Sequence, residues 1–178
     1  MAKKNNEFFV EKKAWSVVKD ELLGCYFMPY VSKILHTGRP LVYVDCFAGK
    51  GKFDDGTPGS PLIALEAIDK CKNITCTKFS QIEATFIDLN YADDLRKNLQ
   101  KYPWVNVVAG KYEDNLANIL QGKEHCNVFL YIDPYGLELQ ILTISALRKT
   151  TSIWQRNRIR VSTYLGRMIL FLLARVEQ

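Results

Sequence analysis

Two kinds of apolar pattern alternate along this chain, short continuous runs and longer repeats with helical spacing. The runs at 41–46, 85–89, 105–109 and 127–132 are rich in branched and aromatic residues, as in strands buried inside a sheet. Segments with helical spacing begin at 60 or span 91–102, 112–120 and 139–148. Strands that alternate with helices predict an α/β, Rossmann-like, doubly wound and mostly parallel sheet with right-handed crossovers.

A helical region is also expected before the first strand. Residues 11–35 predict one long helix or two short ones, which Pro29 would kink or divide. The apolar residues recurring at threes and fours on one face are Trp15, Val18, Leu22, Tyr26 and Tyr30. The next helix is expected to have Ser60 as its N-cap, Pro61 in first position, and a buried stripe of Leu62, Ala64, Leu65 and Ile68.

A glycine turn after the first strand is the first candidate site. The strand ends at Asp45, and Ala48, Gly49 and Gly51 follow. In doubly wound sheets, ligands bind beyond the carboxyl ends of the strands, where glycine lets the backbone come close. An acid and a glycine turn suit a site for S-adenosylmethionine (SAM), whose positive charge the acid would offset. The alternative is an ordinary strand-to-helix turn; a phosphate P-loop is excluded because its motif is missing.

Asp88 is the second candidate, because it ends the second predicted strand. A carboxylate in that place can accept hydrogen bonds from both hydroxyls of a ribose. The alternative is a solvated strand end or an N-cap of the following helix.

The third candidate is the segment Asp133-Pro134-Tyr135 at the end of the fourth predicted strand. Proline fixes the chain direction, the acid can polarise an amine, and the ring can stack on a flat substrate such as a base. These are the predicted catalytic residues of a transfer to an amino nitrogen. The alternative is a type I turn that opens with Asp-Pro. Methylation of cytosine C5 is disfavoured, because it needs a cysteine after the proline.

Two aromatic residues complete the predicted cofactor contacts, Phe47 inside the glycine turn and Tyr112 after the third strand. Lys111 stands where an acid would be expected to contact adenine, and Glu113 is interpreted as a solvated acid at a helix start. Cys46 alternates with Asp45 and is interpreted as a buried structural thiol.

Together these residues resemble the three-Cys-motif partner protein family (TcmP), which is similar to class I SAM-dependent methyltransferases. The resemblance covers about residues 10–147 and lies in Asp45-Cys-Phe-Ala-Gly-Lys-Gly51, Asp55-Gly-Thr-Pro-Gly-Ser-Pro-Leu62 and Ile132-Asp-Pro-Tyr-Gly136, with an N-terminal helix carrying Lys19, Leu23 and Tyr26. It implies that Asp45, Ala48, Gly49 and Gly51 line the cofactor, that Asp88 holds the ribose, and that 133–135 face the substrate. It also implies a radical-SAM-like partner with three cysteines. Lys50 departs from the family, which usually has proline there.

The chain is expected to divide into an N-terminal helical segment (1–40), a SAM-binding core (41–150) and an atypical arginine-rich tail (151–178). The tail holds five arginines, no lysine and one acid, whereas lysine is the main basic residue before it. One hypothesis is a frameshift or truncation near 150, which would end the sheet after strand four and leave an uncovered edge open to self-association. The alternative is a native strand at 159–164 followed by an amphipathic helix from 165.

Composition limits the cellular location and the functions that are expected for this chain. The net charge of +5 lies almost wholly in the tail, so a general nucleic-acid-binding face is not required. Five scattered cysteines favour a reducing, cytoplasmic setting, and no run is long enough to cross a membrane. Three functions are weighed: a SAM-dependent methyltransferase, with nucleic acid as one candidate substrate; a non-catalytic partner module with the same fold; and an NAD enzyme, which the incomplete Gly-x-Gly-x-x-Gly pattern disfavours.

Overall fold

The structure, a computed structural model, describes residues 9–74, 81–133, 158–164 and 169–175, the last two ranges for the backbone alone. In these ranges the helices are α1 (Ala14–His36), α2 (Ser60–Ile74), α3 (Ala92–Asn98) and α4 (Tyr112–Leu120). The strands are β1 (Leu41–Asp45), β2 (Ile82–Asp88), β3 (Asn106–Ala109), β4 (Asn127–Ile132), β5 (Arg158–Tyr164) and β6 (Ile169–Arg175). The helix expected at 139–148 lies outside the described residues.

The strands form one sheet in the order β3-β2-β1-β4-β6-β5. The pairs β1–β2, β1–β4 and β2–β3 are parallel, which confirms the predicted α/β, Rossmann-like architecture. The chain steps outward from β1 to β3 and then returns to β4 on the other side of β1. The carboxyl ends of β1 and β4 therefore flank the point where strand order reverses, the usual ligand position in such sheets.

The expectation that the sheet ends at β4 is corrected. β6 pairs antiparallel with β4 from Val128 opposite Ala174 to Ile132 opposite Leu170, and β5 pairs with β6. The strand expected at 159–164 is present as β5, but β6 replaces the helix expected from residue 165. Six of its seven residues form an apolar run of strand length, and the seventh is Arg175. β4 is thus no open edge for self-association, and the frameshift remains a prediction.

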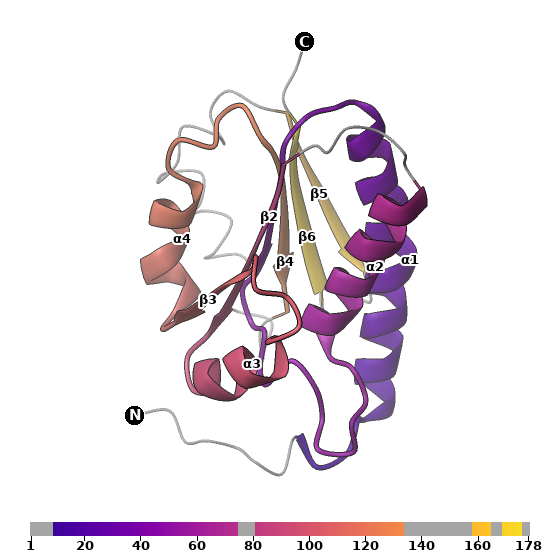
Figure 1. The fold of residues 1–178 in the computed structure, drawn as a ribbon, viewed down its shortest axis with the longest axis vertical. Helices are drawn as coiled ribbons and strands as arrows, with labels where there is room; N and C mark the ends of the chain where they lie inside the picture. Colours follow the sequence, from indigo (N-terminus) through magenta and orange to yellow (C-terminus); the bar gives the residue numbers. More distant parts are fainter. Residues whose placement is uncertain (1–8, 75–80, 134–157, 165–168, 176–178) are drawn as a thin grey trace.

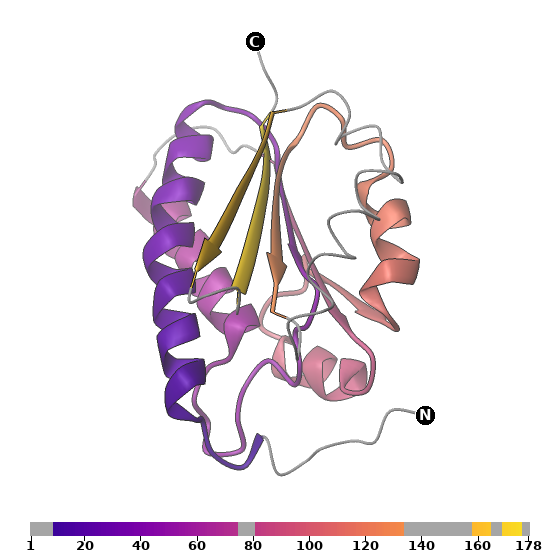
Figure 2. The same ribbon diagram turned by 180° about the vertical axis from the view of Figure 1, so that it is seen from behind.

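Helices cover both faces of the sheet (Figures 1 and 2). α1 and α2 pack side by side on one face, and α4 lies on the other. Because side chains alternate along a strand, each strand serves two cores. The core under α1 and α2 contains the rings of Tyr43, Phe86 and Phe129, while the core under α4 contains Val44 and Leu130.

The buried face of α1 is centred one residue beyond the predicted stripe, of which Leu22, Tyr26 and Tyr30 are partly buried against the core. Trp15 and Val18 are 48% and 43% exposed, whereas Leu23, Phe27 and Val31 are fully buried. The helix carries two apolar stripes that are one residue apart in sequence and about 100° apart around its axis. The second stripe, which contains Leu23, Phe27 and Val31, packs against the sheet. Pro29 lies inside α1 without dividing it. None of the described helices combines the length and hydropathy that a membrane span requires.

Candidate functional site

Strand alternation brings the three predicted acids to one face of the sheet. In the register of the parallel strands, Asp45 lies opposite Phe86 of β2 and Tyr131 of β4. Asp88 and Asp133 follow these two aromatic residues by two positions, so they point to the same side as Asp45. The carboxyl ends of three adjacent strands thus carry acids on the face that α1 and α2 cover, which we call the acid face.

The glycine turn is fastened to both neighbouring strands by backbone hydrogen bonds. The Cys46 amide donates to the Tyr131 carbonyl of β4 at 2.9 Å, and the Ala48 amide donates to the Ile87 carbonyl of β2 at 3.0 Å. The Gly49 amide donates to Asp88 Oδ2 at 2.9 Å. The ends of β1, β2 and β4 therefore lie together around the glycine turn.

The glycines of this turn are required by packing inside the protein. Gly49 and Gly51 have φ values of +60° and +82°, which side chains other than glycine rarely adopt. A Cβ on Gly49 would lie 3.0 Å from the ring of Phe9, and one on Gly51 would lie 2.8 Å from Cδ1 of Leu95. Phe9 is 8% exposed and packs edge-on against Tyr91. The close neighbour of Gly49 in this structure is thus an aromatic ring of the N-terminal segment.

Asp88 binds backbone groups on both sides of the strand end. Its Oδ2 accepts from Gly49, and its Oδ1 accepts from the amides of Asn90 and Tyr91 at 2.8 and 2.7 Å. This geometry resembles the capping alternative, because the acid organises the turn before α3. A carboxylate has about four lone-pair positions, so acceptor capacity remains for a hydroxyl donor. The ribose contact stays a prediction.

Asp45 is fully buried. Its Oδ1 accepts from the Phe47 amide at 3.0 Å, and its Oδ2 accepts from the Ser60 hydroxyl at 2.7 Å. Burial raises the pKa of Asp45 from 3.8 to about 7, because removal from water disfavours the charged carboxylate; the two hydrogen bonds oppose this shift, and Asp133 and Asp88 add to it. Asp45 is therefore poised to change protonation state near neutral pH.

Ser60 has a different role from the one predicted. It is the first residue of α2, and its hydroxyl binds Asp45. The first helical hydrogen bond runs from Ile63 to the Gly59 carbonyl, so Gly59 stands at the N-cap position.

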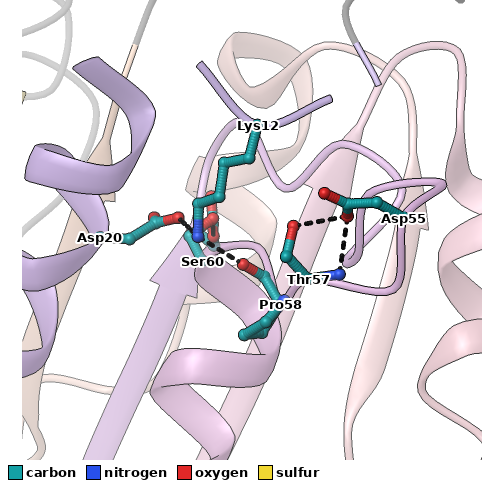
Figure 3. A network of polar contacts seen from close by, with 7 residues as sticks. Lys12, Asp20, Asp55, Thr57, Pro58 and Ser60 are labelled. Atoms are coloured by element: carbon teal, nitrogen blue, oxygen red, sulfur yellow. Dashed lines mark hydrogen bonds and ion pairs between the residues drawn. The ribbon is translucent and has the colours of Figure 1, made fainter. Parts of the chain in front are cut away.

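A lysine from the N-terminal segment ties the loop before α2 to α1, as Figure 3 shows. Lys12 Nζ donates to the Pro58 carbonyl at 2.8 Å and lies 2.6 Å from Asp20 Oδ2. Burial raises the pKa of Asp20 to about 6, although Lys12 opposes the shift. In the same loop, Asp55 accepts hydrogen bonds from the amide and hydroxyl of Thr57.

Asp133 pairs with a second lysine, Lys19, which belongs to α1. Lys19 Nζ lies 2.5 Å from Asp133 Oδ1, and the two side chains are 14% and 23% exposed. Burial raises the pKa of Asp133, while Lys19 lowers it. Pro134 and Tyr135, the other two predicted catalytic residues, lie outside the described residues.

Phe47 and Tyr112 lie in the core under α4. Their ring centroids are 5.1 Å apart, and Tyr112 is 4% exposed. The structure therefore does not bring these two predicted cofactor contacts to the acid face. Cys46 is buried in the same core, as predicted, and Glu113 is exposed in the first turn of α4, also as predicted.

Sequence reasoning missed the charged residues that α1 and its approach supply, Lys12 and Asp20, and it named Lys19 only within a resemblance. The signal for Lys19 is its spacing. Lys19 stands four residues before Leu23, which places its charge in line with the buried stripe of Leu23, Phe27 and Val31. The sequence around these residues does not show that the N-terminal part of α1 lies beside the carboxyl ends of β1 and β4.

Comparisons with known proteins found a likeness of structure alone. No family model matches the chain, and no curated protein matches it. The CurJ carbon methyltransferase has a TM-score of 0.47 at 12% identity, over 92% of this chain and 55% of that one. A methyltransferase from Geobacter sulfurreducens has a TM-score of 0.40 at 12% identity, over 96% of this chain and 94% of that one.

Fibrillarin from Aeropyrum pernix, solved with bound S-adenosyl-L-methionine, has a TM-score of 0.35 at 10% identity, over 78% of this chain and 66% of that one. This chain thus spans little more than half the length of the CurJ structure. TM-scores and identities this low carry no argument about function, and we judge the site on its own residues.

Proposed function

We propose that this protein binds S-adenosylmethionine at the carboxyl ends of β1, β2 and β4 and transfers its methyl group to an amino nitrogen. One observation carries the proposal: Asp45, Asp88 and Asp133 lie on one face at the reversal of strand order, beside a glycine turn fastened to Asp88. Strand-end acids gathered at such a point are a typical ligand site of a doubly wound sheet.

The residues present fit this cofactor. Asp88 has acceptor capacity for a ribose hydroxyl. The adjoining turn packs against Phe9 at Gly49 and against Leu95 at Gly51, so the acids carry this fit. Asp45 is a buried acid whose described partners, a hydroxyl and an amide, are both neutral. The positive charge of the sulfonium would balance the negative charge of its carboxylate. When bound, SAM supplies an electrophilic methyl group that passes to nitrogen while the S–C electron pair stays on sulfur.

Asp133 is the group proposed to hold the acceptor. Its carboxylate would accept a hydrogen bond from the amine and take up the proton that the nitrogen loses. Burial raises the pKa of Asp133, which makes its carboxylate a better proton acceptor than an exposed one. Pro134 and Tyr135 are proposed to face the acceptor, which we propose is an amine on a nucleobase of a nucleic-acid substrate.

A non-catalytic partner module is the second candidate, and one contact favours it. Lys19 Nζ already occupies Asp133 Oδ1, so an acceptor amine must share or displace that lysine. In this version the protein keeps the fold and acts by docking to another protein. Following the resemblance to the TcmP family, we propose a radical-SAM-like protein with three cysteines as that partner, in the cytoplasm.

Calorimetric titration of the full chain with SAM tests the binding step. We expect saturable heat for the wild type and for Asp93→Ala, a control acid whose side chain is 91% exposed on α3. Asp88→Ala should weaken binding at least tenfold, because it removes the proposed ribose acceptor and the anchor of Gly49. Absence of heat from the wild type at millimolar ligand would remove the methyltransferase proposal.

Methyl transfer is tested separately with labelled SAM and pools of nucleic acid or protein. We expect label in the nucleic-acid pool with wild-type protein. Asp133→Asn should bind SAM as the wild type does and incorporate no label. Binding without incorporation by the wild type in any pool would favour the partner module.

A further inference from the structure

The acids of the acid face differ in how their charge is balanced. Asp20 pairs with Lys12 at 2.6 Å, and Asp133 pairs with Lys19 at 2.5 Å. Asp88 accepts hydrogen bonds from three backbone amides, the partners that commonly stabilise a carboxylate. Asp45 is the most buried of the four, at 0% exposure, and within the described ranges it has no ion pair.

Every described element around Asp45 fails to supply a cation to it. β1 itself and α2 contribute neutral groups, β2 contributes an acid, and β4 contributes a phenol and an acid. The turn contains Lys50, which is paired with Asp54 at 3.1 Å. The titratable or polar groups concerned are Tyr43, Cys46, Ser60, Asp88, Tyr131 and Asp133. The two lysines of the acid face are held by other carboxylates, Lys12 by Asp20 and Lys19 by Asp133.

A buried acid without a cation is costly when charged, so burial favours its protonated form and a nearby positive charge favours the ionised form. The ligand proposed above carries that charge on its sulfonium before transfer and loses it afterwards, because the thioether product is neutral. The same position in the site therefore meets a cation before the reaction and a neutral sulfur after it.

Building on the proposed SAM site, we propose that Asp45 is a specificity-determining residue that selects the sulfonium ligand over the neutral thioether, because the sulfonium binds with loss of the Asp45 proton and the thioether does not. Asp45 would thus favour entry of the methyl donor and exit of S-adenosylhomocysteine from one site.

The pH dependence has a defined sign. The pKa of Asp45 is about 7 without ligand, so at pH 6 most molecules carry the proton and at pH 8 most do not. A nearby cation lowers that pKa, and binding at pH 6 must therefore expel the proton. Affinity for SAM should rise about tenfold from pH 6 to pH 8 and level off above, following the ionised fraction of a group that titrates near 7.

Calorimetry of the full chain with SAM and with S-adenosylhomocysteine, at pH 6, 7 and 8 in two buffers of different ionisation heat, measures both affinity and proton release. We expect SAM to release up to one proton per site near pH 6 and the thioether to release far less. In Asp45→Asn, the amide oxygen can still accept from the Phe47 amide, and the NH2 group can donate to the Ser60 hydroxyl. The proton release that comes from Asp45 should vanish in this variant. The ratio of the affinities for SAM and S-adenosylhomocysteine should also change less between pH 6 and pH 8 in this variant than in the wild type.

Three results would overturn the inference. No binding of either ligand removes it together with the proposed function. Binding with the same proton release in wild type and Asp45→Asn removes the inference and leaves the proposed function standing. If Asp45→Asn does not fold, Ser60→Ala replaces it. The Ser60 hydrogen bond lowers the pKa of Asp45, so its loss should shift the pH midpoint upward, and an unmoved midpoint contradicts the role of Asp45.

Discussion

The two faces of the sheet are made by the same strands and yet contain different chemistry. Under α4, Val42, Val44, Val128 and Leu130 pack against Leu116 and Leu120 in a mainly aliphatic core. On the acid face, aromatic rings are the largest side chains of the core, and carboxylates and lysines lie at the carboxyl ends of the strands. Side chains alternate along each strand, which separates the aliphatic residues from the acids and aromatic rings. A shift of one residue along a strand would therefore move its terminal acid to the opposite face of the sheet.

The difference shows where this fold accepts a cost in stability. The aliphatic face buries groups that gain from leaving water, whereas the acid face holds Asp20 and Asp45 with pKa values raised to about 6 and 7. Groups with strongly perturbed pKa values cluster at functional sites. The acid face is therefore the side of the sheet on which we expect ligand binding.

The largest expected loss of folding stability comes from truncating buried side chains in the two cores. Phe129 is fully buried, with ring centroids 4.7 Å from Phe27 and 5.7 Å from Tyr43. Phe129→Ala should lower the free energy of unfolding by about 4 kcal/mol, and Leu130→Ala on the opposite face by about 3 kcal/mol. Urea unfolding followed by circular dichroism measures both; a loss below about 1 kcal/mol at Phe129 would show that the aromatic core is not packed as described.

Asp45→Asn should change how stability depends on pH. The folded pKa of Asp45 is about 7 and its unfolded value is 3.8, so the folded state holds a proton that the unfolded state releases between these pH values. Stability from this group is present below pH 4 and is lost as pH rises to 7. At pH 8 the variant should gain about 4 kcal/mol over the wild type, relative to the same comparison at pH 4.

Unfolding curves of both proteins between pH 4 and pH 8 test this prediction. Asp20 titrates in both and cancels from the comparison. Parallel stability curves for wild type and variant would mean that Asp45 is ionised in the folded protein throughout.

Lys19→Met should destabilise by about 2 kcal/mol, because it leaves Asp133 partly buried without its cation; the residual exposure keeps the loss below that of a fully buried pair. The loss should be larger at pH 8 than at pH 5, where more of Asp133 is protonated. Thermal unfolding at the two pH values measures it. A double change, Lys19→Met with Asp133→Asn, should restore much of the stability, and failure to do so would locate the loss in packing.

Lys123→Met is expected to give the smallest effect. Lys123 lies 2.6 Å from Glu83, about as close as Lys19 to Asp133, but these side chains are 26% and 46% exposed. Water and salt screen such a pair, so its loss should cost less than about 1 kcal/mol. Unfolding in low and high salt tests the contrast. A loss equal to that of Lys19→Met would show that contact distance, and not burial, sets the energy.

Much of the parallel core was predictable from residues alone, because its strands are apolar runs of strand length. β4 and α4 have the predicted bounds, and β1 ends one residue earlier than expected. Asp45 and Asp88 could be placed at strand ends for the same reason. The apolar run at the start of β6 was interpreted as helical, since short runs suit either structure and only pairing with β4 decides between them.

The missing parts of the site depend on contacts between distant segments. The register of α1 over the sheet decides that Leu23 and Phe27 are buried, and the same register brings Lys19 to Asp133. Ser60 fits an N-cap in sequence, but its hydroxyl has a stronger acceptor in the buried Asp45 carboxylate. Local patterns contain neither piece of information.

Backbone NMR of the full chain during titration with SAM tests the central claim most directly. We expect the amide resonances of Gly49, Asp88 and Asp133, at the ends of β1, β2 and β4, to shift and saturate together. Those of Leu116 and Leu120 in α4 should stay in place. Shifts confined to α4, or no shifts at millimolar ligand, would contradict a cofactor site on the acid face.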